Sequence, residues 1–131
     1  WIRFVMLQNE CWHHENVVLL GDALHTAHFS IGSGTKLALE DAIALADALA
    51  AEPTVAQALP RFQALRQESV AAYQAASLAS LRWLEAVDVD LAATPLSFAY
   101  KLMTRSGRVD RDSLERRDPM FFAALESEGL V

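Results

Sequence analysis

A short apolar run that stops abruptly at a glycine constrains the fold of this chain more than any other feature. Val17-Val18-Leu19-Leu20 is followed at once by Gly21-Asp22, which is the pattern of a strand buried on both faces, as in a parallel sheet. A parallel sheet needs several strands joined by long crossovers, so one such strand cannot form it alone. We therefore expect the neighbouring strands to come from chain outside these 131 residues, or from a second copy.

The loop after this strand has the residue types of a ligand-binding corner. Gly21 permits a sharp turn, and Gly32 and Gly34 let backbone N–H groups come close to a ligand. The carboxylate of Asp22 can accept a hydrogen bond from a ribose hydroxyl. A helix that begins near Thr35 would direct the positive end of its dipole to the same place. The loop is therefore the first place to look for a cofactor or an anion.

The rest of the chain is predicted to be mainly helical, because its apolar residues recur at helical spacing and turn residues separate the runs. We expect one or two short strands, the glycine-rich loop and three helices. The segments predicted to be regular are a strand over 1–8, helices over 36–51, 54–85 and 94–107, and a short helical stretch over 119–125.

Composition and charge exclude several function classes. The net charge of −6 and the lack of a clustered basic face argue against nucleic-acid binding. No apolar run reaches the roughly 18–20 residues of a membrane span. Cys11 is the only cysteine, which is typical of a reduced cytoplasmic protein. The four histidines have no metal-ligand spacing, so no metal site is predicted.

Three short sequence strings in the glycine-rich loop and the helix predicted after it resemble the second flavin-binding signature of the aromatic-ring hydroxylase flavoproteins. These proteins are single-component FAD monooxygenases. They are Gly21-Asp22-Ala23-Leu24-His25, Gly32-Ser33-Gly34 and Glu40-Asp41-Ala42. The resemblance covers about residues 16–50. Further similarity over 25–38, 80–85 and 104–106 is to the branch that hydroxylates aromatic acyl-CoA thioesters, with salicylyl-CoA 5-hydroxylase and 2-aminobenzoyl-CoA monooxygenase as representatives.

The resemblance implies a fold, cofactors and site residues. The parent protein would have an α/β FAD/NAD(P)-binding fold, with residues 1–51 as the end of its FAD-binding domain and 52–131 as a helical segment packed on it, in one structural unit. FAD would be reduced by NADPH or NADH and would react with O2, and the substrate would be a small aromatic molecule. The residues implied at the cofactor are Gly21, Asp22, Gly32, Ser33, Gly34, Thr35 and Lys36, and those on the substrate side are His28, Phe29 and Ser30. No catalytic residue is implied in this chain.

Two positions depart from the family pattern. Phe29 stands where many members have proline, which removes the substrate contact expected from a proline carbonyl. Lys36 stands where many have asparagine, and its charge would lie near the flavin or in solvent. Asp41 is open to two interpretations, as a helix-packing residue or as an anchor for backbone N–H groups of the loop.

The sequence alone leaves two alternative functions open. The chain could belong to another FAD oxidoreductase of the superfamily, or could be a helical self-association module without a catalytic role. It has no Gly-x-Gly-x-x-Gly fingerprint for the pyrophosphate, so we expect the isolated chain to be inactive. An open sheet edge and unpartnered apolar faces predict a homo-oligomer.

Overall fold

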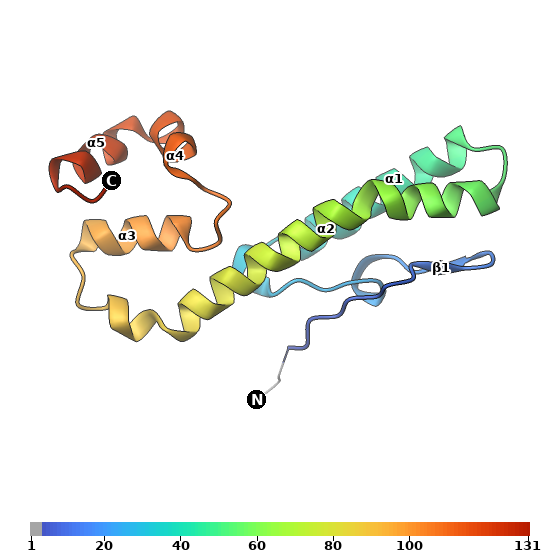
Figure 1. The fold of residues 1–131 in the computed structure, drawn as a ribbon, viewed down its shortest axis with the longest axis horizontal. Helices are drawn as coiled ribbons and strands as arrows, with labels where there is room; N and C mark the ends of the chain where they lie inside the picture. The colour runs from blue at the N-terminus through green and yellow to red at the C-terminus, as the bar shows by residue number, and fades with distance from the viewer. Residues whose placement is uncertain (1–3) are drawn as a thin grey trace. The chain divides into compact units, whose positions relative to one another are not determined.

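The computed structural model describes residues 4–131. Its elements in chain order, with η marking a short 3₁₀ helix, are β1 (His13–His14), β2 (Val17–Val18), η1 (Gly21–Ala23), η2 (Phe29–Ile31), α1 (Gly34–Ala51), α2 (Val55–Glu85), η3 (Val87–Asp90), α3 (Pro95–Thr104), α4 (Arg111–Arg117) and α5 (Pro119–Ser127) (Figure 1). The described chain is mainly helical with one two-stranded sheet, which confirms the predicted composition of elements.

Two compact units make up the chain, and the division between them falls inside α2, after Ser77. The first unit contains the strands, the loop, α1 and most of α2, and the second contains the end of α2 and helices α3 to α5. The sequence analysis places a boundary after residue 51 instead. In the structure, α1 and the first part of α2 share one core, which is why the change of unit comes later. The domain division of the parent protein stays a prediction.

Both predicted strands differ from their expected form. Residues 1–3 lie outside the described residues, residues 4–7 are irregular, and Gln8 forms only an isolated antiparallel bridge. The second strand is not buried on both faces, because it pairs antiparallel with β1 across the turn Glu15-Asn16 and Val17 is 63% exposed. Without parallel neighbours, its N–H and C=O groups have only the adjacent segment as partner.

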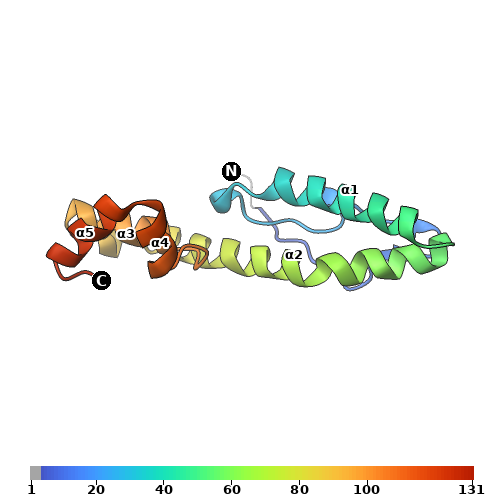
Figure 2. The ribbon, with the colours of Figure 1, turned by 90° about the horizontal axis from the view of Figure 1, so that it is seen from above.

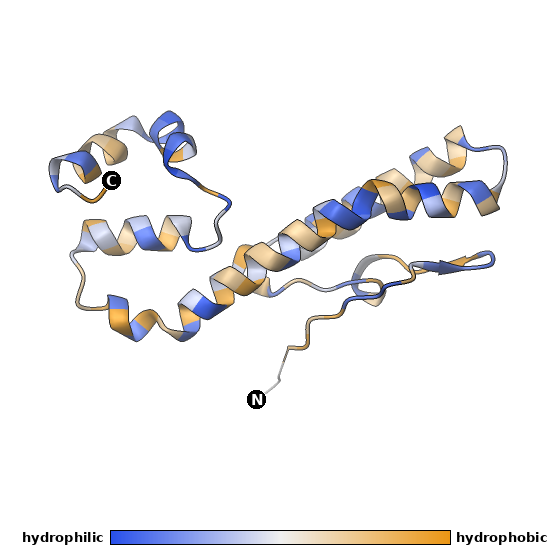
Figure 3. Ribbon diagram, in the orientation of Figure 1, coloured by the Kyte–Doolittle hydropathy of each residue, from blue (hydrophilic) through white to orange (hydrophobic). Residues whose placement is uncertain are grey.

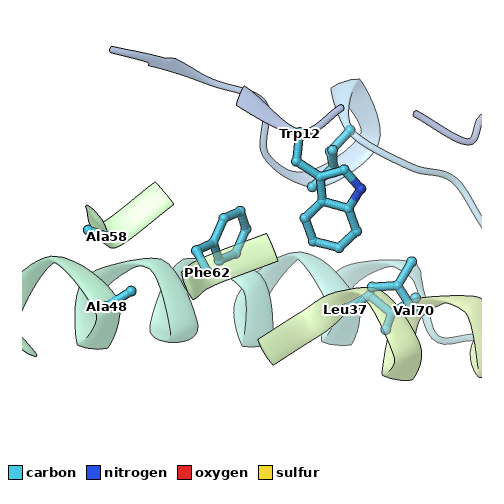
Figure 4. Packing of buried hydrophobic residues seen from close by; sticks show 7 residues of the cluster. Trp12, Leu37, Ala48, Ala58, Phe62 and Val70 are labelled. Carbon is cyan, nitrogen blue, oxygen red and sulfur yellow. The ribbon is translucent and has the colours of Figure 1, made fainter. Parts of the chain in front are cut away.

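Helices α1 and α2 form an antiparallel hairpin that holds the core of the first unit (Figure 2). Leu37 and Val70 lie near one end of the core, and Ala48 and Ala58 near the other (Figure 4). The loop side contributes two more core residues, Trp12 and Leu24, and the Trp12 and Phe62 rings pack with centroids 5.5 Å apart. The apolar faces predicted for the two helices are therefore the faces that meet.

The second unit contains one helix that the sequence analysis misses. Helix α5 contacts both α3 and α4. Leu114 of α4 and Phe122 and Leu125 of α5 are buried. The missed helix is α4. With it, and with the helical stretch predicted over 119–125 that forms α5, the described residues contain five α-helices. Its signal was the N-cap Asp110, whose side chain accepts a hydrogen bond from the Ser113 N–H at 2.7 Å.

Apolar surface remains on α1 outside the core. Hydrophobic and hydrophilic residues alternate along α1 and α2, whereas the tip of the β1–β2 hairpin is hydrophilic (Figure 3). Leu39 and Ile43 of α1 are 61% and 62% exposed. None of the helices within residues 4–131 combines the length and apolar character that crossing a membrane requires.

Candidate functional site

The turn at Gly21 is closed by its own backbone. The Gly21 carbonyl accepts hydrogen bonds from the N–H groups of Leu24 at 2.9 Å and His25 at 3.0 Å. Gly21 has φ +59°, and a Cβ placed on it would lie 3.6 Å from the Ala38 Cβ, an ordinary contact. The backbone conformation, not a lack of space, therefore requires glycine. The turn leaves the Asp22 side chain exposed to solvent.

The start of α1 is left uncapped. Gly32 ends η2 with φ +62°, and Ser33 is the N-cap residue of α1. The buried Ser33 hydroxyl does not cap the helix, because it donates to the Ile31 carbonyl at 3.2 Å. As at the start of any α-helix, the N–H groups of residues 34–36 have no intrahelical acceptor, and here the Ser33 side chain provides none either. A Cβ on Gly32 or on Gly34 would meet no atom within 4 Å, so open space adjoins these groups.

The substrate-side candidates are held against α2 by a buried serine. Ser77 is fully buried, and its hydroxyl accepts a hydrogen bond from the His28 N–H at 3.2 Å. The Ser30 hydroxyl donates to the Ser77 carbonyl at 3.4 Å, and the Ser30 N–H donates to His28 Nδ1 at 3.3 Å. Phe29 between them is 66% exposed and meets the Phe4 ring edge-on. The segment therefore has a fixed backbone and one open aromatic side chain.

Lys36 has partners within its own unit. Its ammonium group forms an ion pair with Glu40 one turn further along α1, and donates to the Tyr73 hydroxyl at 2.9 Å. The hydrogen bond with Glu40, followed by that with Tyr73, raises the pKa of Lys36. The ammonium group is thus bound by Glu40 and Tyr73, while the side chain remains 51% exposed to solvent. A position of this charge near the flavin stays a prediction.

A buried carboxylate joins the loop to both helices. Asp41 of α1 is fully buried and accepts hydrogen bonds from His25 Nε2 at 2.7 Å and Arg66 Nε at 2.8 Å. An ionised carboxylate only accepts, so the His25 ring nitrogen donates. Asp41 therefore anchors the loop, as one of the two interpretations expects, but it does so through the His25 side chain and not through backbone N–H groups.

Sequence reasoning missed three polar residues of α2 that hold this loop. Arg66, Gln74 and Ser77 lie in a helix that was interpreted from its apolar residues alone. The one available signal concerned Arg66, since a buried carboxylate requires a cationic or hydrogen-bonding partner. Which cation it would be cannot be deduced from the spacing, because Asp41 and Arg66 are 25 residues apart.

Gln74 supports the segment that runs into the loop. It is 3% exposed, and its Nε2 donates to the carbonyls of Leu7 at 2.9 Å and Thr26 at 2.8 Å. Its Oε1 accepts from Gln8 Nε2 at 2.8 Å. A cavity of about 200 Å³ next to it, lined by Gln74 and His25 among others, is below the roughly 300 Å³ at which ligand pockets begin. The open start of α1 is therefore the better candidate for a cofactor.

Acid should destabilise the first unit through Asp41. Burial alone would raise the pKa of Asp41, but the hydrogen bonds from His25 and Arg66 outweigh it and lower the pKa below its ordinary value of 3.8. A carboxyl with a lowered pKa contributes stability that is present above the ordinary pKa and lost as the pH falls through the folded value. We therefore expect the urea concentration at the unfolding midpoint to decrease once the pH is lowered below about 4. Urea denaturation at a series of pH values measures it.

The variant Asp41→Asn is the control for this pH dependence, because it has no titrating group at this position. Its stability at neutral pH should be lower, and its loss between about pH 5 and pH 3 smaller than in the wild type. Equal losses in the two proteins over this range would contradict the assignment to Asp41.

Comparison with known proteins places the chain in a family. A family described as FAD binding domain matches residues 6–74, which is more than half of the chain. This match contains the Gly21 turn, α1, and the Asp41 and Arg66 network. The matched residues all lie in the first of the two units.

Three curated relatives are similar to this chain. The 3-hydroxy-4-methyl-anthranilyl-[aryl-carrier protein] 5-monooxygenase of Streptosporangium sibiricum is 52% identical over 83 residues, covering 63% of this chain and 24% of the relative. Salicyloyl-CoA 5-hydroxylase of a Streptomyces species is 40% identical over 124 residues, covering 92% and 24%. Protodeoxyviolaceinate monooxygenase of Chromobacterium violaceum is 34% identical over 105 residues, covering 80% and 28%.

The chain spans about a quarter of the length of these relatives. The family match and the names of these relatives together confirm the resemblance to flavin-dependent aromatic hydroxylases that the Gly-Asp, Gly-x-Gly and Glu-Asp-Ala strings indicate. The family match and the uncapped glycine-rich start of α1 occupy the same residues. The chain therefore belongs to the FAD binding domain family.

Proposed function

We propose that this chain supplies one end of the FAD site in a protein that hydroxylates an aromatic ring. One observation carries the proposal: the N–H groups of residues 34–36 have neither an intrahelical acceptor nor a side-chain cap from Ser33, and open space adjoins Gly32 and Gly34 beside them. Such a helix start favours negative charge and close approach of a ligand. The names of the three relatives, each a monooxygenase or hydroxylase, support the reaction class.

The residues present fit the sugar-chain and ring end of FAD. Asp22, exposed beside the Gly21 turn, would accept hydrogen bonds from a hydroxyl of the cofactor's sugar chain. Gly32, Ser33 and Gly34 would allow the backbone to lie against the cofactor, and the N–H groups of 34–36 would face its ring. The side chain of Lys36 would contribute less than its backbone, because Glu40 and Tyr73 already bind it.

The contribution of this chain to the chemistry is electrostatic. FAD, when bound, supplies the redox chemistry that links NADPH or NADH to O2. The N–H groups at the start of α1 would stabilise negative charge on the reduced cofactor, and they would need no reorganisation because the helix already holds them in place. The hydrogen bonds of Ser77 and Gln74 would keep the adjoining loop fixed. No acid or base from this chain is required.

The finer proposal is that the substrate is an aromatic acyl-CoA thioester. It is supported by salicyloyl-CoA 5-hydroxylase, whose similarity extends over 92% of this chain. The segment of His28, Phe29 and Ser30 would lie on the substrate side, where the exposed Phe29 ring offers an apolar face to an aromatic ring. Either nicotinamide is compatible with the residues present.

Replacing Asp22 by alanine in the full-length protein tests the cofactor role. A charge-assisted hydrogen bond contributes about 1.5–3 kcal/mol, so the Kd for FAD should rise by about ten- to a hundredfold. Fluorescence titration of the apoprotein with FAD measures it. Asp47→Ala is the matched control, because Asp47 is an exposed aspartate of α1 outside the proposed site. Unchanged FAD affinity and occupancy in Asp22→Ala would contradict the proposed role.

Two further proposals concern the chain as a whole. We propose that it does not retain FAD tightly by itself, because the pyrophosphate fingerprint is not among its residues. We also propose that the whole protein self-associates, and exposed apolar residues such as Leu39 and Ile43 support this. The cytoplasmic location stays a prediction from the sequence.

A further inference from the structure

Arg66 is the cation between the two neighbouring carboxylates of the Glu-Asp-Ala string, and neither the family match nor the relatives' names assign it a role. Its Nε donates to Asp41 Oδ1 at 2.8 Å, and its Nη2 donates to Glu40 Oε2 at 3.0 Å. We propose that Arg66 is a positioning residue that fixes the cofactor loop by holding the Asp41 carboxylate toward His25. This inference rests on the proposed function for its link to FAD.

The geometry of Asp41 shows how Arg66 acts at a distance. One carboxylate oxygen, Oδ1, accepts from Arg66, and the other, Oδ2, accepts from His25 at 2.7 Å. The two bonds share one rigid planar group, so rotation of the carboxylate away from Arg66 also displaces the oxygen that His25 uses. Asp41 and His25 are 0% and 4% exposed, and water therefore has little access to replace either bond.

His25 is a suitable point for fixing the loop. Its backbone N–H donates to the Gly21 carbonyl at 3.0 Å, which closes the turn that precedes the loop. The next residue, Thr26, donates its N–H to the Leu7 carbonyl at 3.1 Å and accepts from Gln74 at 2.8 Å through its own carbonyl. The His25 side chain thus determines how this turn and the segment after it lie against α1.

An arginine is required here, because its guanidinium presents two donors in a fixed plane. Its Nε donates to Asp41 and its Nη2 donates to Glu40. These two carboxylates are on adjacent residues, so their side chains leave the helix in different directions. A lysine has a single charged nitrogen on a flexible stem. Arg66→Lys should therefore keep the positive charge but hold only one carboxylate well.

Hydrogen exchange of the full-length protein without added FAD tests the positioning directly. In Arg66→Lys we expect the amide hydrogens of residues 25–32 to exchange about tenfold faster than in the wild type, as loss of one charge-assisted hydrogen bond implies. Exchange in α5 should not change. Arg61→Lys is the matched control: the same substitution, in the same helix, at an exposed arginine that pairs with Glu52 at 2.8 Å. It should leave residues 25–32 unchanged.

The same two variants are then titrated with FAD. We expect the Kd for FAD to rise about tenfold in Arg66→Lys. This is the lower end of the loss in affinity when a residue that orients a ligand-binding group is removed, as known from metal sites. In Arg61→Lys the Kd for FAD should stay the same. Asp41→Asn combined with Arg66→Lys should add little to Asp41→Asn alone, because both changes act on one bond. Additive effects on the Kd would overturn the route through Asp41.

The possible results separate the two proposals. A wild-type protein that does not bind FAD overturns the proposed function, while the exchange of residues 25–32 still decides the positioning role. Equal exchange of these residues in Arg66→Lys and Arg61→Lys overturns the positioning role. Exchange that becomes faster throughout α1 and α2 by the same factor as in residues 25–32 also overturns it, because Arg66 would then stabilise the whole unit and not the loop in particular. Faster loop exchange with unchanged FAD affinity overturns the link to the cofactor.

Discussion

Replacing Asp41 by alanine should lower the free energy of unfolding of the first unit by about 3 kcal/mol. Removal of one partner of a buried ion pair costs about 3–5 kcal/mol, because the remaining charge loses its compensation. The lower end applies because Arg66 keeps its bond to Glu40. His25, however, is 4% exposed and loses its only side-chain hydrogen bond within the described residues. Native-state hydrogen exchange of α1 and α2 measures this loss locally.

Two variants of α1 isolate the cause. Asp47→Ala removes an exposed aspartate from the same helix and should change the stability by less than about 0.5 kcal/mol. Asp41→Asn keeps the size and one acceptor of the side chain, so its loss should lie between those of the two alanine variants. If Asp41→Ala and Asp47→Ala have the same stability, the buried network does not stabilise the unit.

Replacing Phe62 by alanine should be at least as destabilising, at about 3–5 kcal/mol. Phe62 is fully buried, and its ring packs on Trp12 with centroids 5.5 Å apart (Figure 4). Truncation removes this contact and leaves a cavity between α2 and the segment that carries Trp12. The loop follows that segment, so FAD affinity should fall as well. Urea denaturation followed by far-ultraviolet circular dichroism measures the stability.

Leu65→Ala is the matched control for Phe62, because Leu65 lies three residues further along α2 and is 55% exposed. It should change the stability by less than about 1 kcal/mol. Phe62→Leu, which retains most of the buried apolar surface, should fall between the two. Equal stability of Phe62→Ala and Leu65→Ala would contradict the placement of Phe62 in the core.

Local signals were sufficient for most helices. A helix is predicted over 94–107, and at the start of α3 the Thr94 hydroxyl accepts from the Ser97 N–H at 3.2 Å. A long helix is predicted over 54–85, and near its start the Thr54 hydroxyl donates to Gln57 Oε1 at 2.8 Å. These interactions join residues three positions apart, so the sequence contains all of their determinants.

The strands were predicted poorly for the opposite reason. The pattern of Val17 to Leu20 shows which side chains are apolar. A strand, however, also needs a hydrogen-bonded partner strand, and the local sequence does not indicate which segment that partner is. The structure pairs the first two of these residues with His13 and His14 across a two-residue turn. The irregular course of residues 4–7 has the same origin, since Gln74 satisfies the Leu7 carbonyl in place of a neighbouring strand.

The sequence by itself determined the family, the glycine turn, the helix that follows it and the residues proposed to meet FAD, because all of these depend on neighbours within a few positions of the chain. Only the tertiary structure decided how the loop is fixed. Gln74 and Ser77 reach it from α2, 48 and 49 residues away in sequence, and Arg66 of α2 acts on it through Asp41 of α1. Such contacts depend on how α2 packs on α1. The physical reason is that burying Asp41 obliges the fold to provide a cation, while the packing of the helices determines which one.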